Sequence, residues 1–338
     1  MFKQELCNLC GACLVKCPFN KYTKEEAIAE RRALMEGKWA PILRDCAICH
    51  ACNEICPQGA NPYDLISKLQ GELGEATGPA LVLFEEYAQM TDEKRPKVMA
   101  EPLPEPEESV LTTCVLGERN PELFDSMLYA NLPKLTGPAY YCCMPLELIG
   151  NEEGERDRAQ GFVDVLARYK PREVICFHDT CYHLLSARLP EYDIHAPFRP
   201  VHLFEYLLRT LQEHQDKIIP LNIKIAYQRP CTSRSTPWKE HFLDQLLDLI
   251  GCERVARRYD YKDALCCGRM FTLRGVEERG LEAATKNLDD SLEHGAQALV
   301  CLCNACILSY GKLCEERGLP LYHISELCQV ALGEKQAL

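Results

Sequence analysis

Cysteine dominates the residues of this sequence that could do chemistry, with 22 cysteines in 338 residues. Many stand in short groups with regular spacing: "CNLCGACLVKCP" from position 7, "CAICHACNEICP" from position 46 and "CLCNAC" from position 301. Such thiols can bind metals, form disulfides or pack in a core. The N-terminus carries no apolar segment of the kind that directs secretion, so we expect a reducing compartment, where clustered cysteines bind metal.

The two N-terminal groups share the spacing C-x2-C-x2-C-x3-C-P. In bacterial ferredoxins three thiolates of such a run bind one [4Fe–4S] cluster, and the fourth binds a second cluster. The spacing therefore predicts two cubane clusters, one held by Cys7, Cys10, Cys13 and Cys56, the other by Cys46, Cys49, Cys52 and Cys17. Two zinc knuckles are the alternative, although zinc sites use four ligands each in C-x2-4-C pairs. We expect His50, inside the second group, to be a surface residue.

The overall charge and composition narrow the class of protein. The formal net charge is −12 and the pI is about 5.3, which argues against a nucleic-acid partner because phosphate binding needs clustered Lys and Arg. An apolar content of 47% is typical of a folded chain. No apolar run approaches the roughly 20 residues of a membrane span. We expect a cytoplasmic protein, or one peripheral to a membrane complex.

Composition also divides the chain into segments. Residues 1–90 hold the two cysteine groups and helical patterns, which predicts a mainly helical domain. Residues 91–109 are rich in Pro and Glu, which predicts an extended linker. From residue 110 onward, short β-type runs such as "EVICF" and "ALVCL" alternate with amphipathic helical runs. The fold class is therefore α/β, with two tandem lobes predicted over 110–220 and 221–338.

An internal repeat supports the two lobes. The stretch 173–185 aligns with 298–310 at an offset of 125, which places His178 opposite Cys303. The cysteine pair at 142–143 aligns with the pair at 266–267 at an offset of 124. Three further matches keep the same order: Cys176 with Cys301, Cys181 with Cys306, and Cys114 with Cys231.

The second lobe has the pattern Cys231, 34 residues, Cys266-Cys267, 35 residues, then Cys303-x2-Cys306, with "CCG" at 266–268. This pattern, behind a two-cluster ferredoxin domain, resembles the catalytic subunits of heterodisulfide reductases. It also resembles the iron–sulfur subunits of anaerobic glycerol-3-phosphate dehydrogenase and glycolate oxidase. The resemblance implies a noncubane [4Fe–4S] cluster on these five cysteines. A cubane or a zinc ion on four of the five is the alternative.

The first lobe carries a degenerate version of the motif. Its candidate ligands are Cys114, Cys142, Cys143, His178 and Cys181, with "CCM" in place of "CCG". A second noncubane cluster with one His ligand, another Fe–S cluster or zinc, and a site without metal all remain open. Cysteines in apolar strand or helix patterns are expected to pack in the core rather than bind metal: Cys176, Cys301, Cys252, Cys314 and Cys328.

Two cubane clusters joined to a five-thiolate site would form an electron relay. The resemblance implies a subunit that takes electrons from a flavoprotein, hydrogenase or membrane cytochrome partner. It would reduce, or form, a small-molecule or protein disulfide at the C-terminal cluster. The alternative is a non-catalytic subunit that passes electrons between a dehydrogenase partner and quinone. Arg229 and Arg234, which flank Cys231, are candidates for holding an anionic substrate or for a solvated surface.

Overall fold

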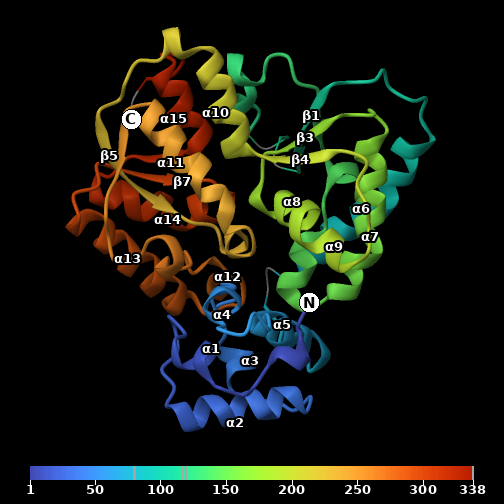
Figure 1. Cartoon of the computed structure of the whole chain (residues 1–338), viewed down its shortest axis with the longest axis vertical. Helices are drawn as coiled ribbons and strands as arrows, with labels where there is room; N and C mark the ends of the chain where they lie inside the picture. Colours follow the sequence, from blue (N-terminus) through green and yellow to red (C-terminus); the bar gives the residue numbers. More distant parts are fainter. Residues whose placement is uncertain (79–80, 116, 119, 337–338) are drawn as a thin grey trace.

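The computed structural model describes residues 1–78, 81–115, 117–118 and 120–336. A small helical domain, coloured blue, lies below two α/β lobes and contacts both (Figure 1). The lobe formed by the green and yellow segments contains the first sheet, and the lobe formed by the orange and red segments contains the second. The predicted fold class is confirmed.

The helices and strands follow the chain in this order. The helical domain and the connection out of it contain α1 (Ala12–Val15), α2 (Lys24–Met35), α3 (Ile42–Asp45), α4 (Ala51–Ile55), α5 (Pro62–Glu72) and α6 (Val82–Ala100). The first lobe contains β1 (Ser109–Cys114), β2 (Lys134–Thr136), α7 (Glu152–Ala167), β3 (Glu173–Cys176), α8 (Asp179–His183), α9 (Leu189–Glu191), β4 (Arg199–His202) and α10 (Leu203–Glu213). The second lobe contains β5 (Ile223–Gln228), α11 (Glu240–Leu249), β6 (Cys252–Arg254), α12 (Arg269–Leu273), α13 (Glu277–Glu293), β7 (Ala298–Cys301), α14 (Asn304–Arg317), β8 (Leu321–His323) and α15 (Ile324–Ala331).

The two lobes repeat one topology. Their sheets are parallel and have the orders β2-β1-β3-β4 and β6-β5-β7-β8, so corresponding strands occupy corresponding places. A histidine ends the last strand of each sheet and caps the following helix. The ring of His202 accepts from the backbone N–H of Phe204 at 3.2 Å, and His323 accepts from that of Ser325 at 3.1 Å. This shared detail supports an origin of both lobes from one repeated unit.

The helical domain holds two cysteine loops of the same shape. Each loop turns through a left-handed residue directly after its second cysteine: Gly11 has φ +73° and His50 has φ +57°. A short helix then starts and carries the third cysteine. The helix α2 spans the loops on the outside, with a capping box at Thr23 and buried Ala27 and Leu34, as its amphipathic pattern predicts.

The extended linker predicted over 91–109 is wrong for its first ten residues, which continue α6 as far as Ala100. The reason is tertiary contact. Thr91 and Arg95 are buried, and the Arg95 guanidinium donates to the carbonyls of Ala139 (2.9 Å) and Tyr141 (2.6 Å). These contacts hold the helix against the first lobe despite Pro96 within it. Residues 101–108 lie outside any helix or strand.

Among the described residues, no helix combines the length and the apolar character that crossing a bilayer requires.

Candidate metal centres

The eight ferredoxin-spaced thiols fall into two groups across the two loops. Burial and the nearby thiols of Cys56, Cys7 and Cys10 together raise the pKa of Cys13 to about 11, against the opposing charge of Arg31. Cys46 lies beside a different thiol: burial and the nearby Cys17 thiol raise its pKa to about 12. The fourth cysteine of each run therefore lies beside the opposite loop, as the ferredoxin spacing predicts.

A small cavity lies at the second of these groups. Its lining includes the four cysteines expected to hold one cubane: Cys17, Cys46, Cys49 and Cys52. The remaining lining consists mostly of apolar side chains, with no carboxylate among them. Thiolates in an apolar, enclosed site are the donors that Fe–S clusters take, so the residues present fit such a cluster.

His50 is not the surface residue that the sequence suggested. Its side chain is 1% exposed and its ring stacks on Tyr63, with the ring centroids 3.8 Å apart. Burial lowers its pKa to about 4, so the imidazole is neutral at pH 7. The sequence could not show this because the covering surface comes from α5 and from the first lobe, far along the chain.

The five thiols of the second lobe form a continuous row. The Sγ atoms of Cys231 and Cys266 are 3.2 Å apart. Hydrogen bonds from the Cys266 and Cys306 thiols hold the pKa of Cys267 well below its usual value, and the Cys306 thiol lowers the pKa of Cys303. Cys231 and Cys303, at the two ends of the row, are half-buried, whereas the other three are buried.

The shape of this row bears on what it could hold. Within the described part of the chain, no three of these five Sγ atoms all lie within 4.8 Å of one another. One zinc ion with Zn–S bonds of about 2.3 Å draws its thiolates to within about 3.8 Å of each other. A row of five thiols is wider than such a coordination sphere, so the donor set fits a cluster of several metal ions.

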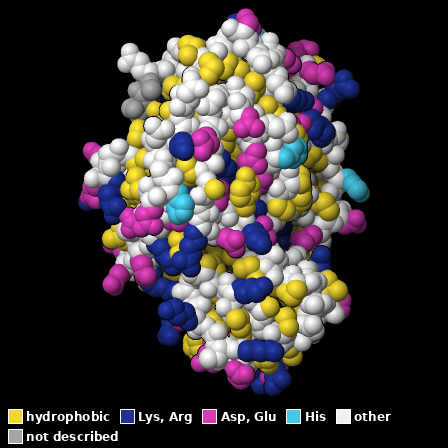
Figure 2. Space-filling model, turned by 60° about the vertical axis from the view of Figure 1, so that its left-hand side comes forward, with side chains coloured by type: hydrophobic (Ala, Val, Ile, Leu, Met, Phe, Trp, Pro, Cys, Tyr) yellow, Lys and Arg dark blue, Asp and Glu magenta, His cyan; other side chains and the backbone are white. Residues whose placement is uncertain are grey.

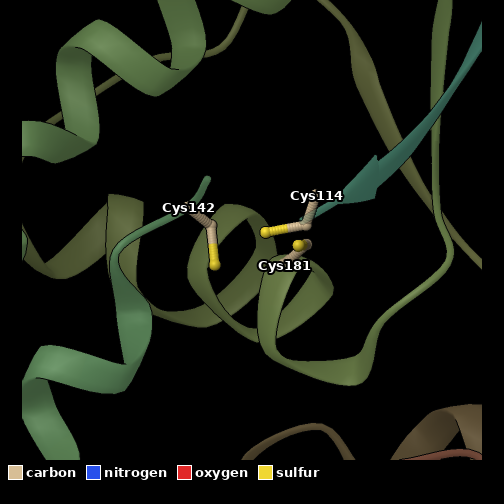
Figure 3. Close-up of side chains that lie close together, drawn as sticks. All are labelled: Cys114, Cys142 and Cys181. Carbon is tan, nitrogen blue, oxygen red and sulfur yellow. The ribbon is translucent and has the colours of Figure 1, made fainter. Parts of the chain in front are cut away.

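The first lobe assembles a compact group of three thiols. Cys114 ends β1, Cys142 lies in the loop after β2 and Cys181 lies on α8 (Figure 3). Their Sγ atoms all lie within 4.8 Å of one another, and all three residues are buried. Burial acts to raise the pKa of Cys114, but hydrogen bonds from the other two thiols hold it well below its usual value. This spacing suits a single ion.

Two of the five ligands expected in the first lobe lie outside this compact group. The Cys143 thiol points toward the carbonyl oxygen of Tyr141, at 3.7 Å. The ring of His178 packs beside Phe177, with the centroids 5.6 Å apart, and its Nε2 is buried without a hydrogen-bond partner. The first lobe therefore presents three clustered ligands where the sequence suggested five.

The reason is the register of the repeat. Cys143 precedes the helical turn at Met144–Ile149 with φ +59°, and Gly268 precedes α12 with φ +76°. These two residues are equivalent, so the offset of 125 holds here as well and the sequence match at 124 is wrong by one residue. Cys142 then corresponds to Cys267, and the position of Cys266 is occupied by Tyr141.

Side chains around Cys231 connect the second lobe to the ferredoxin-like loops. Arg229 and Arg234 are buried, and both donate to the carboxylate of Glu54, at 2.9 Å and 2.6 Å. Glu54 lies between Cys52 and Cys56 in the second cysteine loop. The arginines therefore join two metal centres and are not a solvated surface. Sequence reasoning missed Glu54, whose only signal was its place inside the cysteine group.

A buried ion pair connects the two lobes in a similar way. Asp179, at the start of α8, pairs with Lys239 and accepts from the hydroxyl of Thr232, the residue after Cys231. The Nε2 of His202 lies 3.2 Å from the same carboxylate. Lys239 is 0% exposed. Neither Asp179 nor Lys239 was singled out from the sequence, because a single Asp or Lys carries no spacing signal.

The cysteines expected to pack in the core all do so. Each is at most 3% exposed, and none belongs to the thiol groups described above: Cys176, Cys252, Cys301, Cys314 and Cys328.

Two models of known protein domains match parts of the chain. The model of a 4Fe-4S dicluster domain matches residues 3–60, and the model of a cysteine-rich domain (CCG) matches residues 225–310. No curated protein matches the chain. A crystal structure of a hypothetical protein from Helicobacter pylori shares the fold with a TM-score of 0.56 and 10% sequence identity. The match covers 93% of this chain but 65% of that protein, so this chain spans under two thirds of its length.

The matched domains and the thiol geometry together define the class. The chain is an iron–sulfur protein in which a 4Fe-4S dicluster domain precedes a cysteine-rich CCG domain.

Proposed function

We propose that the chain is a heterodisulfide-reductase-like subunit. Electrons from a flavoprotein, hydrogenase or membrane cytochrome partner enter the dicluster domain and pass to the five-thiol site of the second lobe. There a small-molecule or protein disulfide takes up two electrons and two protons and leaves as two thiols, or the reverse reaction forms the disulfide. The clusters, when bound, supply reversible one-electron storage. We place this reaction in the cytoplasm or beside a membrane complex.

One observation carries the proposal: the second cysteine loop and the five-thiol row share a single core. Cys49, Cys266, Cys267 and Cys306 pack in one apolar cluster, with Cys231 and Cys303 against it. Burial raises the pKa of Cys49; the Arg234 guanidinium lowers it and the Cys231 thiol raises it. Adjacent sites in a dry environment favour electron transfer between them.

The exposure of the row supports a role for its ends in substrate binding. Only Cys231 and Cys303 are half-buried, so a substrate sulfur can approach the row at its ends and not at its middle. The arginines beside Cys231 are held by Glu54 and by Glu240, which lies 2.9 Å from the Arg229 Nε. We therefore assign Arg229 and Arg234 to positioning the Cys231 loop.

For the first lobe we propose a single zinc ion held by Cys114, Cys142 and Cys181. The three Sγ atoms within 4.8 Å support one ion, and the missing equivalents of Cys266 and Cys303 leave too few thiolates for a second five-ligand cluster. Such a site would hold β1, α8 and the loop between β2 and α7 together.

The incomplete first lobe also keeps a second function open. A subunit that carries electrons from a dehydrogenase partner to quinone would need the same relay but no disulfide site. Only one lobe retains the full set of thiols, which is the observation in favour of this alternative.

Spectroscopy of anaerobically purified, oxidised protein separates the two. Addition of candidate thiols should produce a paramagnetic signal from the C-terminal cluster, and Cys303→Ala should lose that signal while the dicluster domain keeps its iron. Cys301→Ala, a buried cysteine two residues away, is the matched control and should keep both. Absence of any thiol-induced signal together with electron transfer to a quinone analogue would refute disulfide chemistry.

A further inference from the structure

A wide groove runs between the dicluster domain and the second lobe, next to one of the proposed cluster ligands. Its volume is about 720 Å³, within the range of small-molecule sites. Cys17 and Phe19 line it from the first cysteine loop, and Phe271 and Arg279 line it from the second lobe. Lys and Arg side chains, with Asp and Glu side chains among them, lie along the narrow middle of the molecule in the view of Figure 2.

The groove is cationic on an acidic protein. Lys21, Arg258 and Lys286 line it, and among the residues the structure describes no carboxylate forms an ion pair with any of the three. The acids in its lining are Asp263 and Glu282. Arg279 also lines the groove but pairs with Asp45 at 3.7 Å, so the lining has three cations outside ion pairs against two carboxylates, whereas the whole chain has a net charge of −12. A local excess of positive charge in a concave site concentrates anions.

Two of the cations contact the same aromatic ring. The Arg258 guanidinium lies 5.1 Å from the ring centroid of Tyr259, and the Lys286 ammonium lies 5.4 Å from it. The ring attracts both cations without neutralising either charge. An anion in the groove would therefore meet cations whose positions this ring helps to fix.

A short chain of hydrogen bonds joins the groove to the cluster ligand. Arg279 donates to the Asn20 side-chain oxygen at 2.9 Å, and the Asn20 amide donates to the Cys17 sulfur at 3.7 Å. Cys17 is half-buried and lines both the groove and the cavity of the second cubane site. A molecule bound in the groove would lie within contact distance of a cluster sulfur.

We propose that this groove binds a small anionic one-electron carrier that exchanges electrons with the second cubane cluster through Cys17. Cys17, Cys46, Cys49 and Cys52 would hold the cluster, which would supply one-electron chemistry: the carrier would gain the single electron that the reduced cluster gives up. The inference rests on the proposed function only in that it requires the second cubane. It adds a further site of electron exchange, located between the dicluster domain and the disulfide site.

Binding is tested without electron transfer by the redox-inert anion hexacyanochromate(III). Equilibrium dialysis of the oxidised holoprotein at low ionic strength should show one site. Arg258→Gln and Lys286→Gln should each weaken binding roughly fivefold, since a neighbouring charge contributes about that factor in water. Lys94→Gln is the matched control, an exposed lysine on α6 at the other side of the molecule, and should leave binding unchanged. Equal binding by all four proteins, or none by the wild type, would overturn the proposal.

Electron exchange is tested by stopped-flow oxidation of the reduced protein. Ferricyanide should react more slowly as salt increases, although the protein is acidic overall, and the double variant Arg258→Gln/Lys286→Gln should react at least tenfold more slowly. The cation hexaammineruthenium(III) should not lose rate in the variant. If the rate of oxidation by ferricyanide instead increases with salt, the net negative charge of the protein governs the reaction, and the proposal is refuted. The thiol-induced signal at the C-terminal cluster should not change in these variants, so it reports separately on the disulfide reaction.

Discussion

Gly268 gives the sharpest test of how the second lobe builds its thiol row. It follows Cys267 directly and has φ +76°, a backbone conformation that costs other residues about 1 to 2 kcal/mol. A Cβ there would lie 2.8 Å from the Gly280 Cα and closer still to its carbonyl oxygen. Carbon atoms pack best at about 3.5 to 4.0 Å, so α12 and α13 would have to move apart.

Gly268→Ala should therefore destabilise the protein by about 2 to 5 kcal/mol, since overpacking adds about 1 to 3 kcal/mol to the backbone cost. Because the shift displaces Cys267, roughly a third of the iron should be lost, as expected if one of three four-iron clusters fails to assemble. Anaerobic urea unfolding and iron analysis measure the two effects.

Gly295→Ala is the matched control. Gly295 has φ +79°, but a Cβ there meets nothing within 4 Å, so only the backbone cost of about 1 to 2 kcal/mol applies and the iron should stay. The difference between the two variants isolates the clash with Gly280. Equal stability loss and full iron in both variants would refute the account of the Cys267 loop.

Three further predictions concern the ion pairs between domains, a buried cysteine and a buried histidine. Glu54→Gln should lower the free energy of unfolding by about 2 to 3 kcal/mol, because two buried arginines lose a charged acceptor. Glu36→Gln, at an exposed ion pair, should lower it by under about 1 kcal/mol. Urea midpoints that fall equally in the two variants would contradict this. Cys314→Ala should leave the iron content unchanged, since its buried thiol contacts no metal centre; loss of iron would place it among the ligands. Burial and Lys239 lower the pKa of His202 from 6.5 to about 4, so the unfolded chain takes up the proton first as pH falls. The free energy of unfolding should therefore fall by about 3 kcal/mol as the pH decreases from 6.5 to 4. His202→Asn should flatten the stability-against-pH curve over that window.

The amino-acid sequence alone determined the class of chemistry in this protein. Thiolate spacing is set by local chain geometry, so C-x2-C-x2-C-x3-C-P predicts its cluster loops without any knowledge of the fold. The repeat at 173–185 and 298–310 likewise predicted two lobes, because strand, turn and helix follow each other within a dozen residues. The strands that position the ligands, β3 and β7, fall within these predicted runs.

Tertiary structure decided what local spacing leaves open. Cys143 aligned with Cys267 by residue type, but the left-handed turn before the next helix places it opposite Gly268, outside the thiol group. Burial of His50 and Arg229 likewise depends on surfaces brought from other parts of the chain. Local sequence sets which donors stand near one another in a loop. Packing between distant segments decides which of them converge on one site, because that depends on backbone register and on charges paired across domains.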